Sequence, residues 1–178
     1  MNITGSRNYV ELAASQWVLR FAALVADGGR VLDVACGTGR HACLFASLGY
    51  RVEAVDRDIS GFVTVPSSVN ALEADIEAGA WPYGGEQFAG VLVTNYLYRP
   101  LMPILIASVA PGGAFIYETF TAGNERFGRP SRPDFLLQPG ELLETVRGHL
   151  QVVAFEEIQV DLPKPAKVQR IAAVRSAA

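Results

Sequence analysis

The feature that most constrains this chain is a glycine turn between a β-rich run and a helical pattern. Residues 30–35 read RVLDVA, and Gly37 and Gly39 follow before a helical pattern over residues 40–48. Because glycine lacks a Cβ, the backbone can bend sharply there and approach a ligand closely. The unpaired N–H groups at the start of the next helix make the turn electropositive. The sequence therefore predicts a strand–turn–helix unit with a ligand site at its turn.

The same alternation of strand and helix continues along the chain. We predict further strands over residues 51–56, 71–75, 88–94, 114–119, 150–160 and 166–175, and helices over residues 9–26, 97–109 and 140–148. Such alternation indicates a parallel sheet with crossover helices. The last two strands have a connection too short for a crossover, so they form an antiparallel hairpin. Residues 57–70 hold Gly61, Pro66 and several β-branched residues, which predicts a short helical turn and loop instead of a full helix.

Length and charge restrict the class of protein. The 178 residues suit one domain, expected to span 1–178 with a helical cap over 1–28 and a core over 29–175. The net charge is −3, and the only lysines are Lys164 and Lys167, so we expect no nucleic-acid partner. We also expect no membrane span and no secretory leader, which makes the cytoplasm the predicted location. Cys36 and Cys43, even with His41, match no zinc spacing, so no metal is predicted and the thiols are expected to be reduced.

The glycine spacing alone leaves two kinds of ligand open. Gly37, Gly39 and Ala42 also satisfy the dinucleotide fingerprint, and Asp56 stands where either kind of cofactor has its ribose hydroxyls. Asp33 separates the two, because a carboxylate at the end of the first strand would repel a pyrophosphate. The same carboxylate favours the sulfonium and ammonium groups of S-adenosylmethionine. Asp75 and Ile76, after the third strand, are predicted to meet the adenine amino group and ring.

With these residues the sequence resembles the class I S-adenosylmethionine-dependent methyltransferases over about residues 29–175. The first motif of that family is acid-x-Gly-x-Gly-x-Gly, to which Asp33, Gly37 and Gly39 correspond, while Ala35 replaces the first glycine. The resemblance also makes Asp56 the ribose acid and Asp75 the adenine acid. It implies a single-domain α/β Rossmann-like fold, with a seven-stranded mostly parallel sheet of order 3-2-1-4-5-7-6 and a C-terminal antiparallel hairpin.

A finer resemblance rests on three short segments. Residues 36–41 (CGTGRH), 94–97 (TNYL) and 123–130 (GNERFGRP) are similar to small bacterial methyltransferases related to the tellurite-resistance methyltransferases. We apply this resemblance to the cofactor site and not to tellurite chemistry. The predicted cofactor-binding residues are Asp33, Ala35, Cys36, Gly37, Gly39, Asp56, Arg57, Asp75, Ile76, Thr94 and Asn95.

The acceptor side is expected near the carboxyl ends of the strands, where ligands bind in open α/β sheets. Residues 95–97 differ from the acid-or-Asn-Pro-Pro-aromatic motif of nucleic-acid amino-methyltransferases, which argues against base methylation. No catalytic residue is assigned; the candidates for a proton acceptor are Glu118, Tyr98 and His41, although His41 could equally pack locally. Substrate-side candidates are Tyr98, Arg99, Arg126 and Arg129. The arginines suit an anionic molecule, or they pair with nearby acids or a second subunit.

The predicted function is transfer of a methyl group from S-adenosylmethionine to a small molecule, leaving S-adenosylhomocysteine. Since the cofactor brings its own activation, absence of a catalytic triad does not argue against an enzyme. Two alternatives stay open. One is a catalytically silent S-adenosylmethionine-binding module, favoured by Ala35 and the reduced segment 57–70; the other is an NAD-dependent oxidoreductase. A homodimer is also left open.

Overall fold

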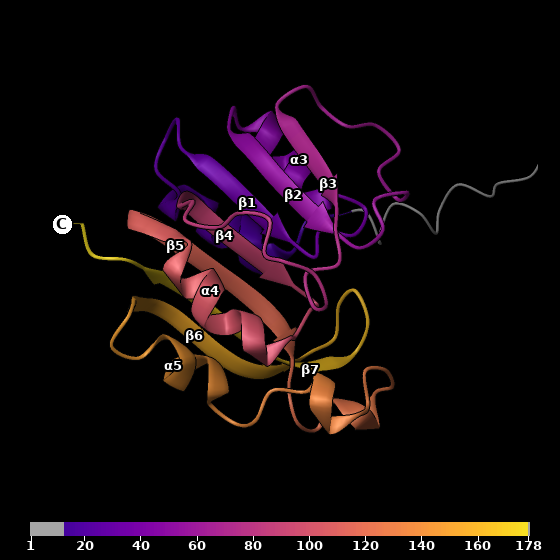
Figure 1. Cartoon of the computed structure of the whole chain (residues 1–178). Coiled ribbons are helices and arrows are strands. Elements are labelled where there is room, and N and C mark those ends of the chain that lie inside the picture. The colour runs from indigo at the N-terminus through magenta and orange to yellow at the C-terminus, as the bar shows by residue number, and fades with distance from the viewer. Residues whose placement is uncertain (1–12, 178) are drawn as a thin grey trace, which may run out of the picture.

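The computed structural model describes residues 13–177, so predictions for residues 1–12 and 178 lie outside the described part. Its seven strands form one sheet in the order β3-β2-β1-β4-β5-β7-β6, which confirms the predicted topology (Figure 1). The strands are β1 Arg30–Val34, β2 Arg51–Asp56, β3 Val69–Glu73, β4 Phe88–Thr94, β5 Val109–Phe120, β6 Gln151–Val160 and β7 Ala166–Val174. Neighbours from β3 to β5 are parallel, whereas β7 runs antiparallel to both β5 and β6.

Short helices cover the two faces of the sheet. The helical segments are α2 Gln16–Phe21, η1 Ala22–Leu24, α3 Arg40–Ser47, η2 Arg99–Leu101, α4 Met102–Ala107, η3 Asn124–Arg126, η4 Pro133–Phe135 and α5 Glu141–Val146. Helices α2 and α3 pack on one face, and α4 and α5 on the other (Figure 1). None of the helices in residues 13–177 combines the length and the apolarity that crossing a membrane requires.

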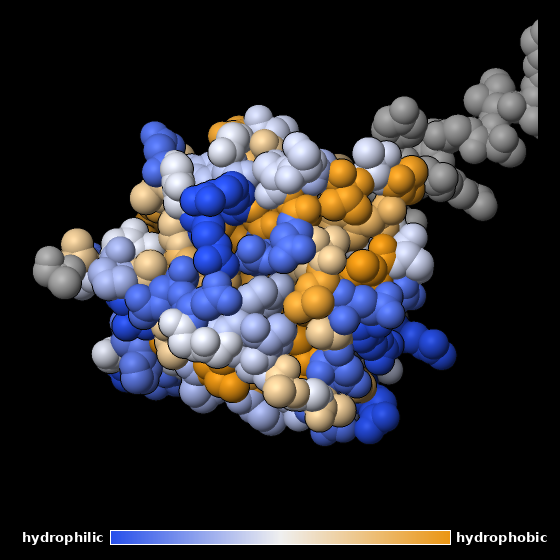
Figure 2. All heavy atoms as spheres, turned by 45° about the horizontal axis from the view of Figure 1, so that its top comes forward, coloured by the Kyte–Doolittle hydropathy of each residue, from blue (hydrophilic) through white to orange (hydrophobic). Residues whose placement is uncertain are grey.

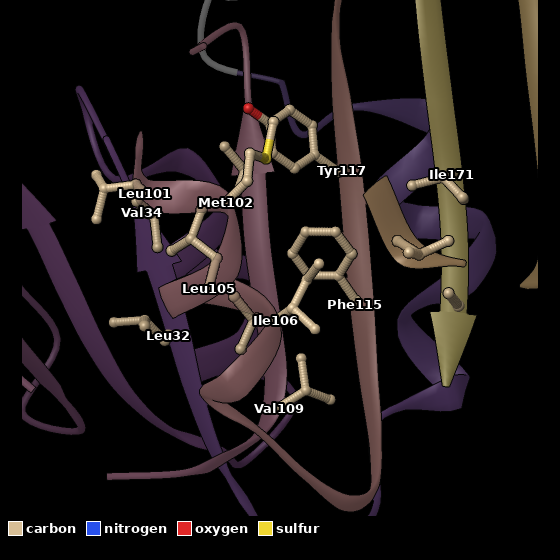
Figure 3. Close-up of a cluster of buried hydrophobic side chains, with 14 of the residues drawn as sticks. Leu32, Val34, Leu101, Met102, Leu105, Ile106, Val109, Phe115, Tyr117 and Ile171 are labelled. Atoms are coloured by element: carbon tan, nitrogen blue, oxygen red, sulfur yellow. The ribbon is translucent and has the colours of Figure 1, made fainter. Parts of the chain in front are cut away.

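Each face has its own hydrophobic core. In the first, Met102, Leu105 and Ile106 of α4 point toward Phe115 of β5 and Leu32 of β1 (Figure 3). In the second, Trp17 of α2 and Phe45 of α3 pack over Leu92, Ile116 and Ala172. Successive side chains of β4 therefore point alternately into the two hydrophobic cores, which explains why this strand is apolar throughout.

Several predicted boundaries were wrong for identifiable reasons. Residues 97–109 form a 3-10 turn and a six-residue helix instead of one long helix, because Pro100 and Pro103 lack the N–H groups that a continuous helix needs. Strand β5 starts at Val109 and not at residue 114 as predicted, and its first residues have a register irregularity against β4. Helix α2 starts only at Gln16, where Ser15 caps it.

The third strand lies two residues earlier than predicted. It begins at Val69, which pairs with Val52 and is buried, and it ends at Glu73. Asp75 therefore stands two residues beyond the strand, in a turn. The crossovers 57–68 and 74–87 contain no helix, so the loop predicted within residues 57–70 is present, but the short helical turn predicted there is not formed. Figure 1 accordingly shows no helix in front of β2 and β3.

Candidate functional site

The glycine turn joins β1 to α3 through left-handed backbone conformations. Ala35, Gly37 and Gly39 have φ angles of 53°, 54° and 74°. At Gly39 a Cβ would lie 2.0 Å from the ring of Phe62, so glycine is required there both for its φ angle and for space. Ala35 occupies the motif position at which the methyltransferase family has glycine, and its positive φ explains that preference. Phe62, from the crossover after β2, had no sequence signal that tied it to this turn.

Asp33 supports the turn from below. Its side chain is buried, with 1% exposed, and its Oδ2 accepts a hydrogen bond of 2.9 Å from the N–H of Ala42 in α3. Burial raises the pKa of Asp33 to about 7. The side chain therefore points into the protein and holds the start of α3, and the expectation that its charge favours a cationic ligand stays a prediction.

Asp56 closes the turn from the end of β2. Its Oδ2 accepts a 2.8 Å hydrogen bond from the N–H of Gly37, and its Oδ1 accepts one of 3.1 Å from the N–H of Asp58. The structure thus brings together Gly37 and Asp56, two residues that the sequence assigned to one site. Because Asp56 is only half-buried, its carboxylate is accessible to a hydroxyl group beside the turn.

The predicted adenine residues differ in exposure. Asp75 is exposed, and its Oδ1 accepts hydrogen bonds of 2.9 and 3.0 Å from the N–H groups of Glu77 and Ala78. These bonds from Ala78 and Glu77 lower the pKa of Asp75, so the carboxyl group is ionised. Ile76 is 8% exposed and belongs to the core on the α4 side, so it offers a ligand little surface.

The carboxyl end of β4 presents a strained residue. Asn95 has a φ of 55° and is exposed, while its N–H donates a 2.9 Å hydrogen bond to the carbonyl oxygen of Glu118. A residue other than glycine in this conformation marks a position where surrounding structure imposes the backbone shape. Thr94 is buried beside His41, and the Tyr98 hydroxyl donates to the carbonyl of Glu77 at 3.2 Å. Asn95 is thus the residue at this strand end that faces outward.

Two candidate proton acceptors are engaged in hydrogen bonds. His41 is 1% exposed, and its Nε2 accepts a 3.0 Å bond from the N–H of Ser15. Burial, and then the charge of Arg40, lowers the pKa of His41 to about 3, so the ring is neutral. Glu118 accepts a 2.7 Å bond from the Ser15 hydroxyl and pairs with Arg170 at 3.1 Å. Both residues therefore hold structure together: Nε2 of His41 and both carboxylate oxygens of Glu118 are engaged in these contacts.

The arginines predicted on the substrate side separate into two groups. Arg99 donates to both carboxylate oxygens of Glu141, at 2.6 and 2.9 Å, and to the carbonyls of Asp134 and Leu136. It clamps the segment before α5 and lines a groove of about 640 Å³ between α4 and α5, which contains none of the predicted cofactor residues. These contacts engage Arg99 within the fold, and its substrate-side role stays a prediction. Arg126 and Arg129 are exposed on the loop after β5.

That loop is held by a residue that the sequence did not single out. Asn124 is 1% exposed; its Nδ2 donates 2.9 Å to the carbonyl of Pro130, and its Oδ1 accepts 3.0 Å from the N–H of Lys167. One buried amide thus joins the loop 123–130 to the first residues of β7. Its partner in β7 is 43 residues away in the sequence, and no local pattern predicts such a pair.

Comparisons with known proteins agree with this architecture. The sequence model of the TehB family, described as tellurite resistance protein TehB, matches residues 7–79, less than half of the chain. TehB from Haemophilus influenzae superposes with a TM-score of 0.73 at 18% identity, covering 89% of this chain and 61% of that one. The chain therefore spans about three fifths of the length of that TehB. No curated protein matches this sequence.

Two further solved structures are methyltransferases with bound cofactor or product. The glycopeptide N-methyltransferase MtfA, in complex with S-adenosylmethionine, has a TM-score of 0.59 at 20% identity over 89% of this chain and 92% of its own. The 1,6-didemethyltoxoflavin-N1-methyltransferase of Burkholderia thailandensis, with 1,6-didemethyltoxoflavin and S-adenosylhomocysteine bound, has a TM-score of 0.66 at 20% identity over 89% and 76%. This chain has the fold of S-adenosylmethionine-dependent methyltransferases. The predicted resemblance, tellurite-resistance type included, is confirmed.

Proposed function

We propose that this protein transfers a methyl group from S-adenosylmethionine to a small-molecule acceptor. The observation that carries the proposal is the hydrogen bond between Asp56 and the N–H of Gly37, which fixes a carboxylate beside the glycine turn at the ends of β1 and β2. A nucleoside whose ribose bonds to Asp56 extends on one side toward Asp75 and on the other toward the turn. The bound cofactors of MtfA and the toxoflavin enzyme support the choice of ligand.

The residues around the turn fit this cofactor chemically. Asp56 accepts hydrogen bonds from ribose hydroxyls, and the exposed Asp75 carboxylate accepts from the adenine amino group. The exposed Gly37 leaves room for the methionine portion, and the buried Asp33 contributes negative charge beneath it. When bound, S-adenosylmethionine supplies a methyl group activated by its positive sulfur.

What this chain adds is alignment and exclusion of water. Asn95 and Tyr98 follow β4, and the loop with Arg126 and Arg129 follows β5, so both segments belong to the carboxyl edge of the sheet. We assign these residues to the acceptor side, where they orient a small molecule against the methyl group. Holding two reactants in line accounts for a large part of the acceleration of such a displacement.

The direct test measures which ligand the protein binds. Titration calorimetry with S-adenosylhomocysteine and, in parallel, NAD compares the two cofactor classes on the same protein. We expect heat of binding and a raised melting temperature with S-adenosylhomocysteine alone. Binding of NAD in its place would identify an oxidoreductase instead. Binding of S-adenosylhomocysteine without turnover of S-adenosylmethionine, across thiol, amine, hydroxyl and oxyanion acceptors, would identify a silent binding module.

A further inference from the structure

Ser15 contacts three separate parts of the molecule. Its N–H donates to Nε2 of His41 at 3.0 Å, one residue past the start of α3. Its hydroxyl donates to Oε1 of Glu118 near the end of β5, at 2.7 Å, and accepts from the N–H of Trp17 in α2 at 3.1 Å. A single residue, through its backbone N–H and its hydroxyl, therefore links α3, which follows the glycine turn, to the end of β5 and the start of α2.

The neighbouring contacts extend this link on both sides. Arg40, beside Gly39, donates to the carbonyl of Ala13 at 3.3 Å. On the other side Arg170 pairs with Glu118 at 3.1 Å, and its guanidinium lies 5.2 Å from the centre of the Trp17 ring. Residues 13–15, which we call the strap, are thus bound to α3 through Ala13 and Ser15 and to β5 through Ser15, and Arg170 of β7 pairs with the same Glu118.

The strap passes over the carboxyl edge of the sheet. Strand β4 lies between β1 and β5, and α3 follows β1, so a contact from α3 to β5 spans the end of β4. Thr94, the last residue of β4, lies 3.4 Å from Nδ1 of His41. This edge is where the proposed cofactor and acceptor meet, and the strap closes it on the side of α2 and α3.

Burial makes these bonds consequential. His41 is 1% exposed, and the side chains of Glu118 and Arg170 are each 15% exposed. A donor or acceptor that loses its partner in such surroundings is left without water to replace it. Opening the strap therefore has to break several bonds together, and a shift of the glycine turn that moves His41 also moves Ser15.

We propose that Ser15 is a positioning residue that couples the glycine turn to the acceptor side, so that the closed strap retains the bound cofactor. This rests on the proposed function. It assigns His41 and Glu118 to the strap and not to proton removal. By thermodynamic linkage, a cofactor that favours the closed turn must in turn hold the strap closed more firmly.

The test compares two substitutions at Ser15. Ser15→Asp keeps an oxygen that caps α2 but places a second carboxylate against Glu118, so it forces the strap open while preserving the cap. Ser15→Thr keeps both the cap and the hydroxyl donor and serves as the matched control. Stopped-flow release of S-adenosylhomocysteine is the readout, with the melting temperature confirming that each variant is folded. We expect about tenfold faster release from the aspartate variant, a cost of about 1.4 kcal/mol, and wild-type release from the threonine variant.

Glu118→Gln separates a strap role from a catalytic one. The amide oxygen still accepts from Ser15, but the amide NH2 group faces Arg170 and the ion pair is lost. Release of S-adenosylhomocysteine should therefore be slower than in the aspartate variant, and the shape of the pH profile of kcat should not change. Loss of kcat together with loss of a limb of the pH profile would identify Glu118 as a base and overturn the assignment. An aspartate variant at Ser15 that is folded and releases product at the wild-type rate would overturn the strap.

Hydrogen exchange of backbone amides tests the strap separately from the proposed function. In the free wild-type protein the Ser15 amide should exchange slowly, and in His41→Leu it should exchange faster, while amides of β4 stay protected. Added S-adenosylhomocysteine should slow the exchange of the Ser15 amide further. If the wild type does not bind S-adenosylhomocysteine, the proposed function fails, whereas slow Ser15 exchange would still support the strap. Fast exchange in the free and the bound wild type would overturn the strap alone.

Discussion

The two halves of the carboxyl edge are built by different kinds of contact. In the cofactor half, carboxylates accept backbone N–H groups of neighbouring segments: Asp33 from Ala42, Asp56 from Gly37. In the acceptor half, side chains from distant segments pair with one another, as Ser15 and Glu118 do across 103 residues. The first arrangement shapes loops that stay open to a ligand. The second forms a network in which the polar side chains are hydrogen-bonded or paired with one another.

The surface shows the same contrast between open and closed regions. The crossovers beside β2 and β3 are loops. On the face seen in Figure 2, hydrophobic patches alternate with hydrophilic residues. Around Arg170, by contrast, charged groups lie beneath α2 and are largely shielded from solvent. A charge removed from the closed half should therefore cost more stability than one removed from the open half, and the following experiments test this difference.

The largest effect is expected from acid. The pKa of His41 is lowered to about 3 in the folded protein, against 6.5 for the free side chain. As the pH falls from 6.5 to 3, the unfolded chain takes up the proton first, so stability is present above this window and is lost within it. Over that pH range the free energy of unfolding of the wild type should fall by up to about 5 kcal/mol more than that of His41→Gln. Urea unfolding of both proteins at several pH values measures the difference; parallel curves would contradict the assignment.

Next comes the ion pair in the closed half. Arg170→Met leaves Glu118 shielded and without its cation, and we expect the free energy of unfolding to fall by about 3 kcal/mol. The matched control is Arg147→Met, which breaks an exposed pair with Glu144 whose side chains are 72% and 67% exposed. That change should leave the free energy of unfolding nearly unchanged, because solvent screens an exposed pair. Equal losses in the two variants, measured by chemical denaturation, would remove the distinction between the halves.

In the open half the effect should fall on binding and not on folding. Asp56→Ala removes the predicted ribose contact and the hydrogen bond to Gly37. It should weaken the binding of S-adenosylhomocysteine by about 1.5–3 kcal/mol. Asp58→Asn is the control, because Asp58 lies two residues further and its side chain bonds to Ser60. Calorimetry gives both affinities. Unchanged binding in the alanine variant would show that the adenosine lies elsewhere.

The smallest effect concerns the charge of Asp33. Because burial raises the pKa of Asp33 to about 7, its carboxyl group ionises as the pH rises through neutrality. S-adenosylmethionine carries a positive sulfur and S-adenosylhomocysteine does not, so affinity for the former should rise more, by about threefold. Asp33→Asn keeps an acceptor for Ala42 and should abolish this difference between pH 6 and pH 8. A pH dependence that survives in the asparagine variant would exclude Asp33 as its source.

Much of the architecture was predictable because it rests on local rules. Gly37 and Gly39 are needed wherever a strand turns directly into a helix, and both have positive φ angles in the structure. The short link between β6 and β7 permits only an antiparallel pair. Where the prediction was wrong, competing local signals decided: Pro103 shortened α4, and the burial of Val69 against β2 moved the third strand.

By itself, the sequence determined the alternation of strands and helices, the final hairpin, the glycine turn and the carboxylates around it, since spacing along the chain sets each of these. The sheet order came from the family resemblance. Only the tertiary structure decided that Asp33 points inward, that Arg99 clamps Glu141, and that His41 and Glu118 meet at Ser15. The physical reason is the distance along the chain over which each interaction acts. Backbone turns and strand periodicity act over a few residues, whereas the pairing of buried polar groups depends on which distant segments the folded sheet brings within hydrogen-bond distance.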